Sequence, residues 1–141
     1  SQHLMSLGIP LNTDSTLKGQ TVFLAERCGE LMYDNIITDR TILDVMAFTL
    51  NAKSIPHQDK DAFEVYASEF IREYDYIFYI SPHGIEIEDN GIRETDEHYR
   101  DLIDFTITTL IKRHGHKAGK IEKISGSTEE RIQQILNITS L

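Results

Sequence analysis

An acidic and a basic residue, Asp39 and Arg40, directly follow the β-branched, apolar run of residues 35–38. Such a run predicts a short buried strand, because β-branched side chains favour sheet positions. A carboxylate at the end of a strand can organise Mg²⁺ or accept a proton from an attacking hydroxyl, and a guanidinium beside it can bind phosphate. Phosphoryl transfer needs both groups, so Asp39 is a candidate catalytic and metal-organising residue and Arg40 a candidate substrate-binding residue. A surface ion pair or a helix N-terminus is the alternative for both.

Two further arginines accompany an acidic stretch in the second half of the chain. Arg93 and Arg100 are seven residues apart, so they share one face of a helix that already begins at Arg93. Both guanidiniums could then point toward the phosphates of a donor, although pairing with the surrounding acids is the alternative. His83 follows the aromatic run of residues 76–80, at the end of a predicted strand. Binding residues of α/β proteins gather at such ends, so His83 is a candidate for lining a substrate cleft.

Periodicity predicts the elements that position these residues. Helices are predicted over residues 14–32, 41–51, 59–74, 95–111 and 127–138, and strands over residues 35–38, 76–80 and 121–124. This alternation favours a single three-layer α/β domain, residues 1–141, with a parallel sheet and helices on both faces. Three strands make a thin parallel sheet, so we expect one or two further strands to attach at its N-terminal side.

Composition limits the classes of function. The formal net charge of −9 disfavours nucleic acid as a partner, because neutralising its phosphates requires a basic surface. No apolar run approaches the roughly 18 residues of a membrane span, and no leader pattern is evident. The single cysteine, Cys28, fits a reducing compartment. We therefore expect a cytoplasmic protein without membrane association, and leave open its self-association into a homo-oligomer.

Residues 35–48 resemble the strand-to-helix segment of P-loop nucleoside and nucleotide kinases, in which Asp-Arg follows a hydrophobic strand and precedes a helix. Residues 88–93, followed by residues 99–104, are similar to the mobile lid and next helix of the ribosylnicotinamide-kinase-like ATPases of bacteria and phages. Residues 8–13 are similar to the segment after that family's second strand. The resemblance covers essentially the whole chain in order and implies a P-loop NTPase-like fold with a lid-like segment at residues 86–100.

The resemblance also implies a function, namely ATP-dependent phosphoryl transfer to a nucleoside, nucleotide or related ribosylated small molecule. Mg²⁺ would be the cofactor and ATP the phosphoryl donor. By resemblance, Arg93 is catalytic and binds nucleotide together with Arg100, whereas Asp44 and Gln20 contact the acceptor. Gly126 and Ser127 would pass near adenine through backbone groups. A helix cap explains the last two residues equally well, and an exposed helical acid is the alternative for Asp44.

The sequence departs from the family in one respect. None of its eight glycines forms the G-x-x-x-x-G-K-[ST] loop that cradles nucleotide phosphates. The family's first strand, P-loop and second strand would precede residue 1, so we expect them upstream of Ser1. Two other readings stay open: a noncatalytic interaction or regulatory module on a P-loop-type scaffold, and an NTPase that couples hydrolysis to a conformational change.

Overall fold

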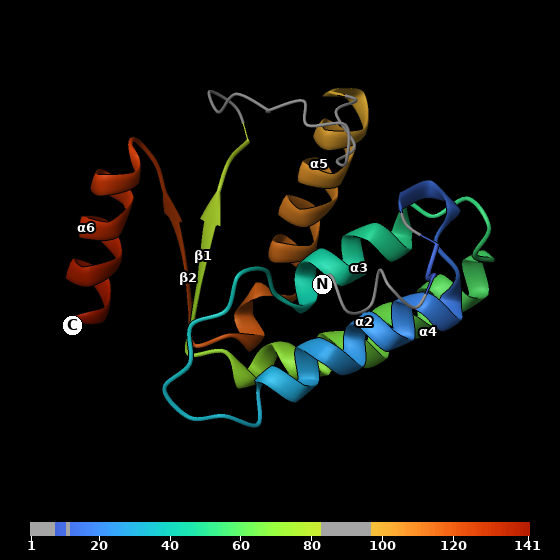
Figure 1. The fold of residues 1–141 in the computed structure, drawn as a ribbon, viewed down its shortest axis with the longest axis horizontal. Helices are drawn as coiled ribbons and strands as arrows, with labels where there is room; N and C mark the ends of the chain where they lie inside the picture. Colours follow the sequence, from blue (N-terminus) through green and yellow to red (C-terminus); the bar gives the residue numbers. More distant parts are fainter. Residues whose placement is uncertain (1–7, 11, 83–96) are drawn as a thin grey trace.

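The computed structural model describes residues 8–10, 12–82 and 97–141. Its helices are α2 (Leu17–Glu30), α3 (Ile42–Leu50), α4 (His57–Ser68), α5 (Glu97–His114) and α6 (Thr128–Thr139), its strands are β1 (Tyr76–Ile80) and β2 (Lys120–Ile124), and its short 3-10 turns are η1 (Asn12–Asp14), η2 (Glu69–Glu73) and η3 (Gly115–Lys117). Helices α2, α3 and α4 pack together at one end of the molecule, α5 lies between them and the strands, and α6 lies beyond β2 at the other end (Figure 1).

The two strands form a parallel pair in which Tyr76 lies opposite Lys120 and Ile80 lies opposite Ile124. Helix α5 is the crossover between them, as parallel pairing requires. Successive side chains point to opposite faces of a strand. Ile77 belongs to the main core and Tyr79 contacts α5, so this side is the core face of the sheet. The opposite side, called the outer face below, carries the side chains of Tyr76, Phe78 and Ile80 from β1 and of Lys120, Glu122 and Ile124 from β2.

The hydrophobic core lies around α3, which contacts α2, α4 and α5. Its fully or nearly fully buried side chains include Leu24, Ile42, Leu43, Met46, Phe63, Ile71, Ile77, Ile103 and Leu110. A capping box fixes the start of α3, because the Thr41 hydroxyl accepts a hydrogen bond from the Leu43 N–H and the Asp44 carboxylate accepts one from the Thr41 N–H. The Tyr74 hydroxyl accepts another from the Ile42 N–H at 3.2 Å. These bonds satisfy amides that have no partner within the helix.

The predicted strand over residues 35–38 is wrong. Residues 31–41 form an irregular connection between α2 and α3 (Figure 1). Asn35 and Arg40 have positive φ angles of 55° and 75°, which a β-strand does not contain, and the Ile37 side chain is 89% exposed. An apolar run becomes a strand only beside another strand, and no strand in the described ranges lies along this one. The chain is therefore mixed α/β, with a two-stranded parallel sheet among its described residues.

The other predicted elements are confirmed, with small shifts at their ends. Helix α4 begins at His57, two residues before the prediction, and the stretch predicted as its C-terminal end forms η2. Both remaining strands and the helix after each are present. The lid-like segment lies mostly outside the described residues, and only residues 97–100 of it are seen, as the first turn of α5. None of the described helices is long and apolar enough to cross a membrane.

Candidate functional site

Polar side chains meet where the carboxyl end of β1 faces α5. The Tyr79 hydroxyl donates a short hydrogen bond to Oδ1 of Asp104. Burial raises the pKa of Tyr79 to about 12, and the bond to the Asp104 carboxylate adds to the rise. Tyr79 therefore remains a protonated donor at neutral pH and is not a general base. The bond holds the end of β1 against α5.

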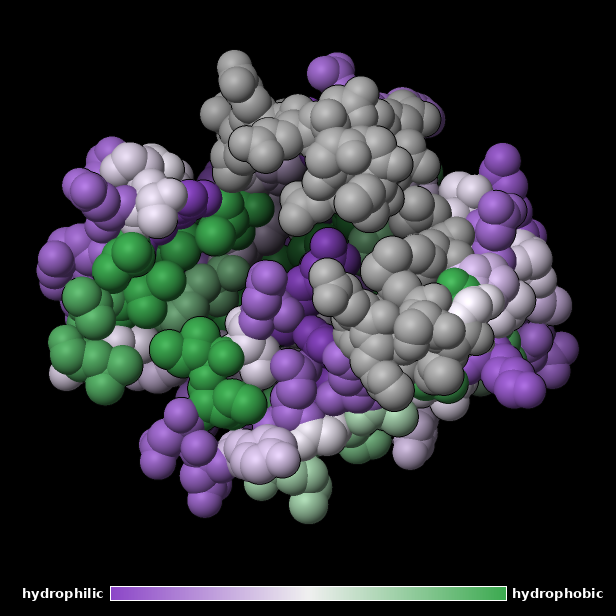
Figure 2. Space-filling view, viewed as in Figure 1, coloured by the Kyte–Doolittle hydropathy of each residue, from purple (hydrophilic) through white to green (hydrophobic). Residues whose placement is uncertain are grey.

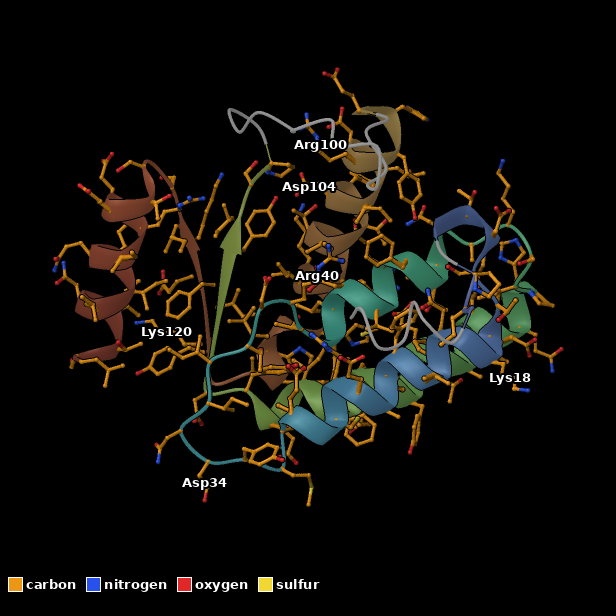
Figure 3. All side chains as sticks on the ribbon, in the orientation of Figure 1. Lys18, Asp34, Arg40, Arg100, Asp104 and Lys120 are labelled. Carbon is orange, nitrogen blue, oxygen red and sulfur yellow. The ribbon has the colours of Figure 1, made fainter. Side chains whose placement is uncertain are left out.

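Arg100 lies one helical turn before Asp104 on α5. Residues four apart share a helix face, and Figure 3 shows both side chains on the side of α5 toward β1. The Arg100 Nε atom is buried and makes no hydrogen bond with the described residues. A buried donor without a partner is destabilising, and more so when the group is charged. A guanidinium so placed is suited to an anionic ligand, since its donors match phosphate oxygens.

Arg40 occupies the connection before α3, with its side chain set against an aromatic ring. Its guanidinium carbon is 5.8 Å from the centroid of the Phe48 ring, within the range of a cation–π contact. The Phe48 ring lies 6.4 Å from the ring of Tyr99, which precedes Arg100 on α5. The two rings thus link Arg40 to the α5 turn that carries Arg100. The exposed guanidinium of Arg40 keeps its donors available to a ligand.

Asp39 is exposed in the same connection, rather than at the end of a strand as predicted. Its backbone carbonyl accepts a hydrogen bond of 3.0 Å from Nη1 of Arg27 on α2, which fixes the connection at this point. No three His, Cys, Asp or Glu side chains in the described part of the chain lie together as a self-sufficient metal site requires. Mg²⁺ in nucleotide sites often has one or two carboxylate ligands, with phosphates and water completing its shell. The Asp39 carboxylate fits that limited role.

Asp44 belongs to the capping box of α3. Its Oδ2 accepts a hydrogen bond of 2.7 Å from the Thr41 N–H. Burial raises the pKa of Asp44, while the Thr41 amide and the nearby Arg40 charge oppose the rise. The carboxylate that was predicted to contact the acceptor is therefore already engaged in the start of the helix.

Gln20, Gly126 and Ser127 lie apart from this group, in α2 and in the turn before α6. Gln20 is 3% exposed in α2. Gly126 has a φ of 98° in the turn before α6, where the Ser127 hydroxyl accepts a hydrogen bond from the Glu130 N–H and the Glu130 carboxylate accepts one from the Ser127 N–H. This second capping box uses the polar groups of the turn. His83 and Arg93 lie outside the described residues.

Sequence reasoning missed the pairing of Tyr79 with Asp104. By sequence alone, Tyr79 has no role beyond the predicted strand over residues 76–80, and Asp104 is included only in the resemblance of residues 99–104. One signal was present, because Asp104 follows Arg100 by four residues and therefore shares its helix face. Nothing local in the sequence indicates that a tyrosine 25 residues away meets it.

Comparison of the chain with protein-family models, with curated proteins and with solved structures finds no significant match in any of the three.

Proposed function

We propose that this chain contributes part of a phosphotransferase site that moves the γ-phosphoryl group of ATP to a nucleoside, nucleotide or related ribosylated small molecule. One structural observation carries the proposal, namely the buried, unpaired Nε atom of Arg100, one turn from the Asp104 carboxylate that Tyr79 holds. The resemblance of residues 35–48, 88–93 and 99–104 to P-loop kinases supports it independently.

Catalysis of phosphoryl transfer consists mainly of positioning the reactants and neutralising their charge. In this proposal different residues perform these two tasks. Arg100 neutralises phosphate charge of the donor, and Tyr79 with Asp104 positions the helix that carries it. Arg40, supported on the Phe48 ring, binds the acceptor. Asp39 would help to hold Mg²⁺, and the ion when bound would supply further neutralisation of the phosphates. Arg93 and His83 are included in the proposed site only because of their positions in the sequence.

The proposed scaffold is a three-layer P-loop NTPase-like domain, of which the β1–β2 pair would be one part. Residues 1–141 contain no glycine-rich phosphate loop, so the proposal assigns to them the acceptor side and the lid side of the site. Gly126, Ser127 and Gln20 are left out, since the first two serve a helix cap and the third is buried in α2. Asp44 is retained only as a residue that positions Arg40 through the start of α3.

The decisive test of the reaction is transfer of label by the full-length protein from [γ-³²P]ATP to a panel of nucleosides and nucleotides in the presence of Mg²⁺. Acceptor-dependent labelling, reduced at least about tenfold by Asp39→Asn, is expected. The matched control is Asp34→Asn, which removes an exposed acid of the same connection. Labelled inorganic phosphate without any labelled acceptor would identify an NTPase instead. Absence of both products, or an unaffected Asp39→Asn variant, would contradict the assignment.

A noncatalytic interaction module is the second candidate. It is favoured by the missing glycine-rich loop and by the exposed apolar side chains of the outer face of the sheet. Such a module would neither bind nor turn over Mg·ATP, so calorimetric titration separates it from the enzyme.

A further inference from the structure

Arg40 has a backbone conformation that residues with a side chain rarely adopt. Its φ angle of 75° lies in the left-handed region, where the Cβ atom is crowded by the backbone. Such a conformation persists only where the surrounding structure holds it, and residues that keep it are concentrated at binding and catalytic sites. The contacts that hold Arg40 in this conformation therefore bear on its function.

Two hydrogen bonds hold the peptide groups on both sides of Arg40. Nη1 of Arg27 donates to the carbonyl oxygen of Asp39 at 3.0 Å, and Oγ1 of Thr38 donates to the carbonyl oxygen of Arg40, also at 3.0 Å. Peptide groups are planar, so the orientations of these two groups determine the φ and ψ angles between them. Thr41, the next residue, belongs to the capping box of α3 and fixes the chain beyond them.

Arg27 is itself held in place on the last turn of α2. Its Nε atom lies 2.9 Å from Oε1 of Glu30, and its Nη2 atom lies 3.2 Å from Oε1 of Glu26. The Arg27 side chain is 14% exposed, so these pairs are partly shielded from water. A guanidinium presents its donors as a planar fork and can contact two carboxylates and a carbonyl group at once, whereas the ammonium group of a lysine has no such fork.

The fixed backbone sets the place of the Arg40 guanidinium. Its carbon atom is 5.8 Å from the centroid of the Phe48 ring on α3. Arg40 is exposed, and Figure 2 shows hydrophilic surface at the centre of the view, where Figure 3 labels this residue. A change of φ rotates the Cα–Cβ bond against the preceding peptide group, so relaxation of the backbone would turn the side chain away from the ring.

We propose that Arg27 and Thr38 are positioning residues, which hold Arg40 in its left-handed conformation so that its guanidinium faces the acceptor. This role rests on the proposed function, in which Arg40 binds the acceptor. Neither residue touches the acceptor, because both act through the backbone of Arg40. Loss of either bond allows Arg40 to relax, and the acceptor then loses a charge-assisted hydrogen bond. Binding of ATP, which the proposed function assigns to Arg100 on α5, is unaffected.

The test is steady-state kinetics of the full-length protein with Arg27→Lys and Thr38→Val, using as acceptor the nucleoside or nucleotide that the parent protein labels most rapidly. Arg27→Lys keeps a positive charge beside the two glutamates, and Thr38→Val keeps the shape of the side chain without its hydroxyl. Each variant is expected to raise the KM for the acceptor at least about fivefold and to leave the KM for ATP within about twofold. A variant that merely unfolds in part loses active enzyme, which lowers the apparent kcat and changes neither KM.

Each variant has a matched control outside the connection. Arg72 in η2 pairs with Glu69 at 3.2 Å with the same three-residue spacing as the pair on α2, so Arg72→Lys is the control for the arginine. The Thr21 hydroxyl donates to the backbone carbonyl of Leu17 within α2, so Thr21→Val is the control for the threonine. Both controls should keep the KM values of the parent protein.

The variant Arg40→Met shows whether the two residues act through Arg40. In that background Arg27→Lys and Thr38→Val should raise the KM for the acceptor by less than about twofold, because the contact that they position is already lost. An equally large rise with and without Arg40 would overturn the proposal, since the two residues would then affect the acceptor by another route.

Limited proteolysis with trypsin gives a readout that is independent of the reaction. Cleavage after Arg40 requires the connection to open locally, because proteases bind their substrates in extended conformations. Mass spectrometry should show that the initial cleavage between Arg40 and Thr41 is at least about fivefold faster in both variants than in the parent protein and the controls. Equal rates would overturn the proposal whether or not transfer occurs. Transfer with an unchanged acceptor KM in both variants would overturn it and leave the proposed function intact, whereas absence of transfer by the parent protein would overturn both.

Discussion

The hydroxyl of Tyr79 donates a hydrogen bond to the carboxylate of Asp104 and so ties β1 to α5, one helical turn from Arg100. Tyr79→Phe removes this bond and leaves the half-buried carboxylate without that donor. We expect the free energy of unfolding in urea to fall by about 1.5–3 kcal/mol, the range for a hydrogen bond to a charged group. Tyr66→Phe is the control, because that side chain is 64% exposed on α4, and it should change the value by less than about 0.5 kcal/mol. Equal effects of the two substitutions would show that the bond does not fasten the sheet to α5.

A second cluster fastens the other end of α5 to α4. Oε2 of Glu64 accepts hydrogen bonds from Arg113 at 2.6 Å and from His114 at 2.7 Å. Burial alone would raise the pKa of Glu64, but the bonds and charges of Arg113 and His114 outweigh it and hold that pKa below its usual value. The resulting stability is present above the pKa of the unfolded state, 4.5, and is lost as the pH falls through the lower pKa of the folded state.

Glu64→Gln should therefore lower stability at pH 7 and flatten its dependence on pH below about 4.5. The measurement is the free energy of urea unfolding between pH 3 and pH 7, with Glu129→Gln at the exposed start of α6 as the control. If the free energy of unfolding falls as steeply with decreasing pH in Glu64→Gln as in the parent chain, the role of this cluster is refuted.

Two substitutions of Asp44 distinguish a structural role in the cap of α3 from a role in catalysis. Asp44→Ala removes the acceptor for the Thr41 N–H and should cost about 0.5–2 kcal/mol of stability at pH 7. Asp44→Asn keeps an oxygen that can accept the bond and removes a buried charge, so it should leave stability unchanged or raise it. If Asp44 only positions the helix, Asp44→Asn also retains phosphoryl transfer, whereas a large loss of transfer in this folded variant would assign it to the reaction.

Two glycines should respond in opposite ways to the same substitution. A Cβ atom at Gly119 would clash with the backbone carbonyl oxygen of Asp75, where β2 begins beside β1. Gly119→Ala must therefore displace the backbone, and we expect a loss of about 1–3 kcal/mol. A Cβ atom at Gly29 in α2 meets nothing within 4 Å, so Gly29→Ala should gain about 0.5–1 kcal/mol. Thermal unfolding of the two variants measures both changes in stability. A loss of stability in Gly29→Ala would show that α2 packs differently.

Local sequence patterns predicted the helices and two of the strands well, because their signals are local. Thr41 with Asp44 and Ser127 with Glu130 are capping pairs that are recognisable three residues apart, and the structure contains both. The apolar runs at residues 35–38 and 76–80 look alike in composition, yet only the second pairs with another strand. Pairing is a long-range property, which explains the error at Ile37.

The candidate site could likewise be predicted only in part from the sequence. The sequence drew attention to Arg40 and Arg100 by residue type, and the structure relates them through the rings of Phe48 and Tyr99. Neither the positive φ of Arg40 nor the bond between Tyr79 and Asp104 follows from neighbouring residues. Both arise from contacts between segments distant in the chain.

Calorimetric titration of Mg·ATP into the full-length protein asks whether Arg100 binds the phosphates of the donor. We expect saturable binding at one site by the parent protein and a dissociation constant raised about 10- to 100-fold in Arg100→Met, as loss of a charge-assisted phosphate contact implies. Met preserves most of the apolar stem of the arginine, and Lys112→Met, at the exposed C-terminal end of the same helix, should bind like the parent. No binding by the parent chain, or equal affinity of Arg100→Met and Lys112→Met, would contradict the proposal that Arg100 binds the phosphates of the donor.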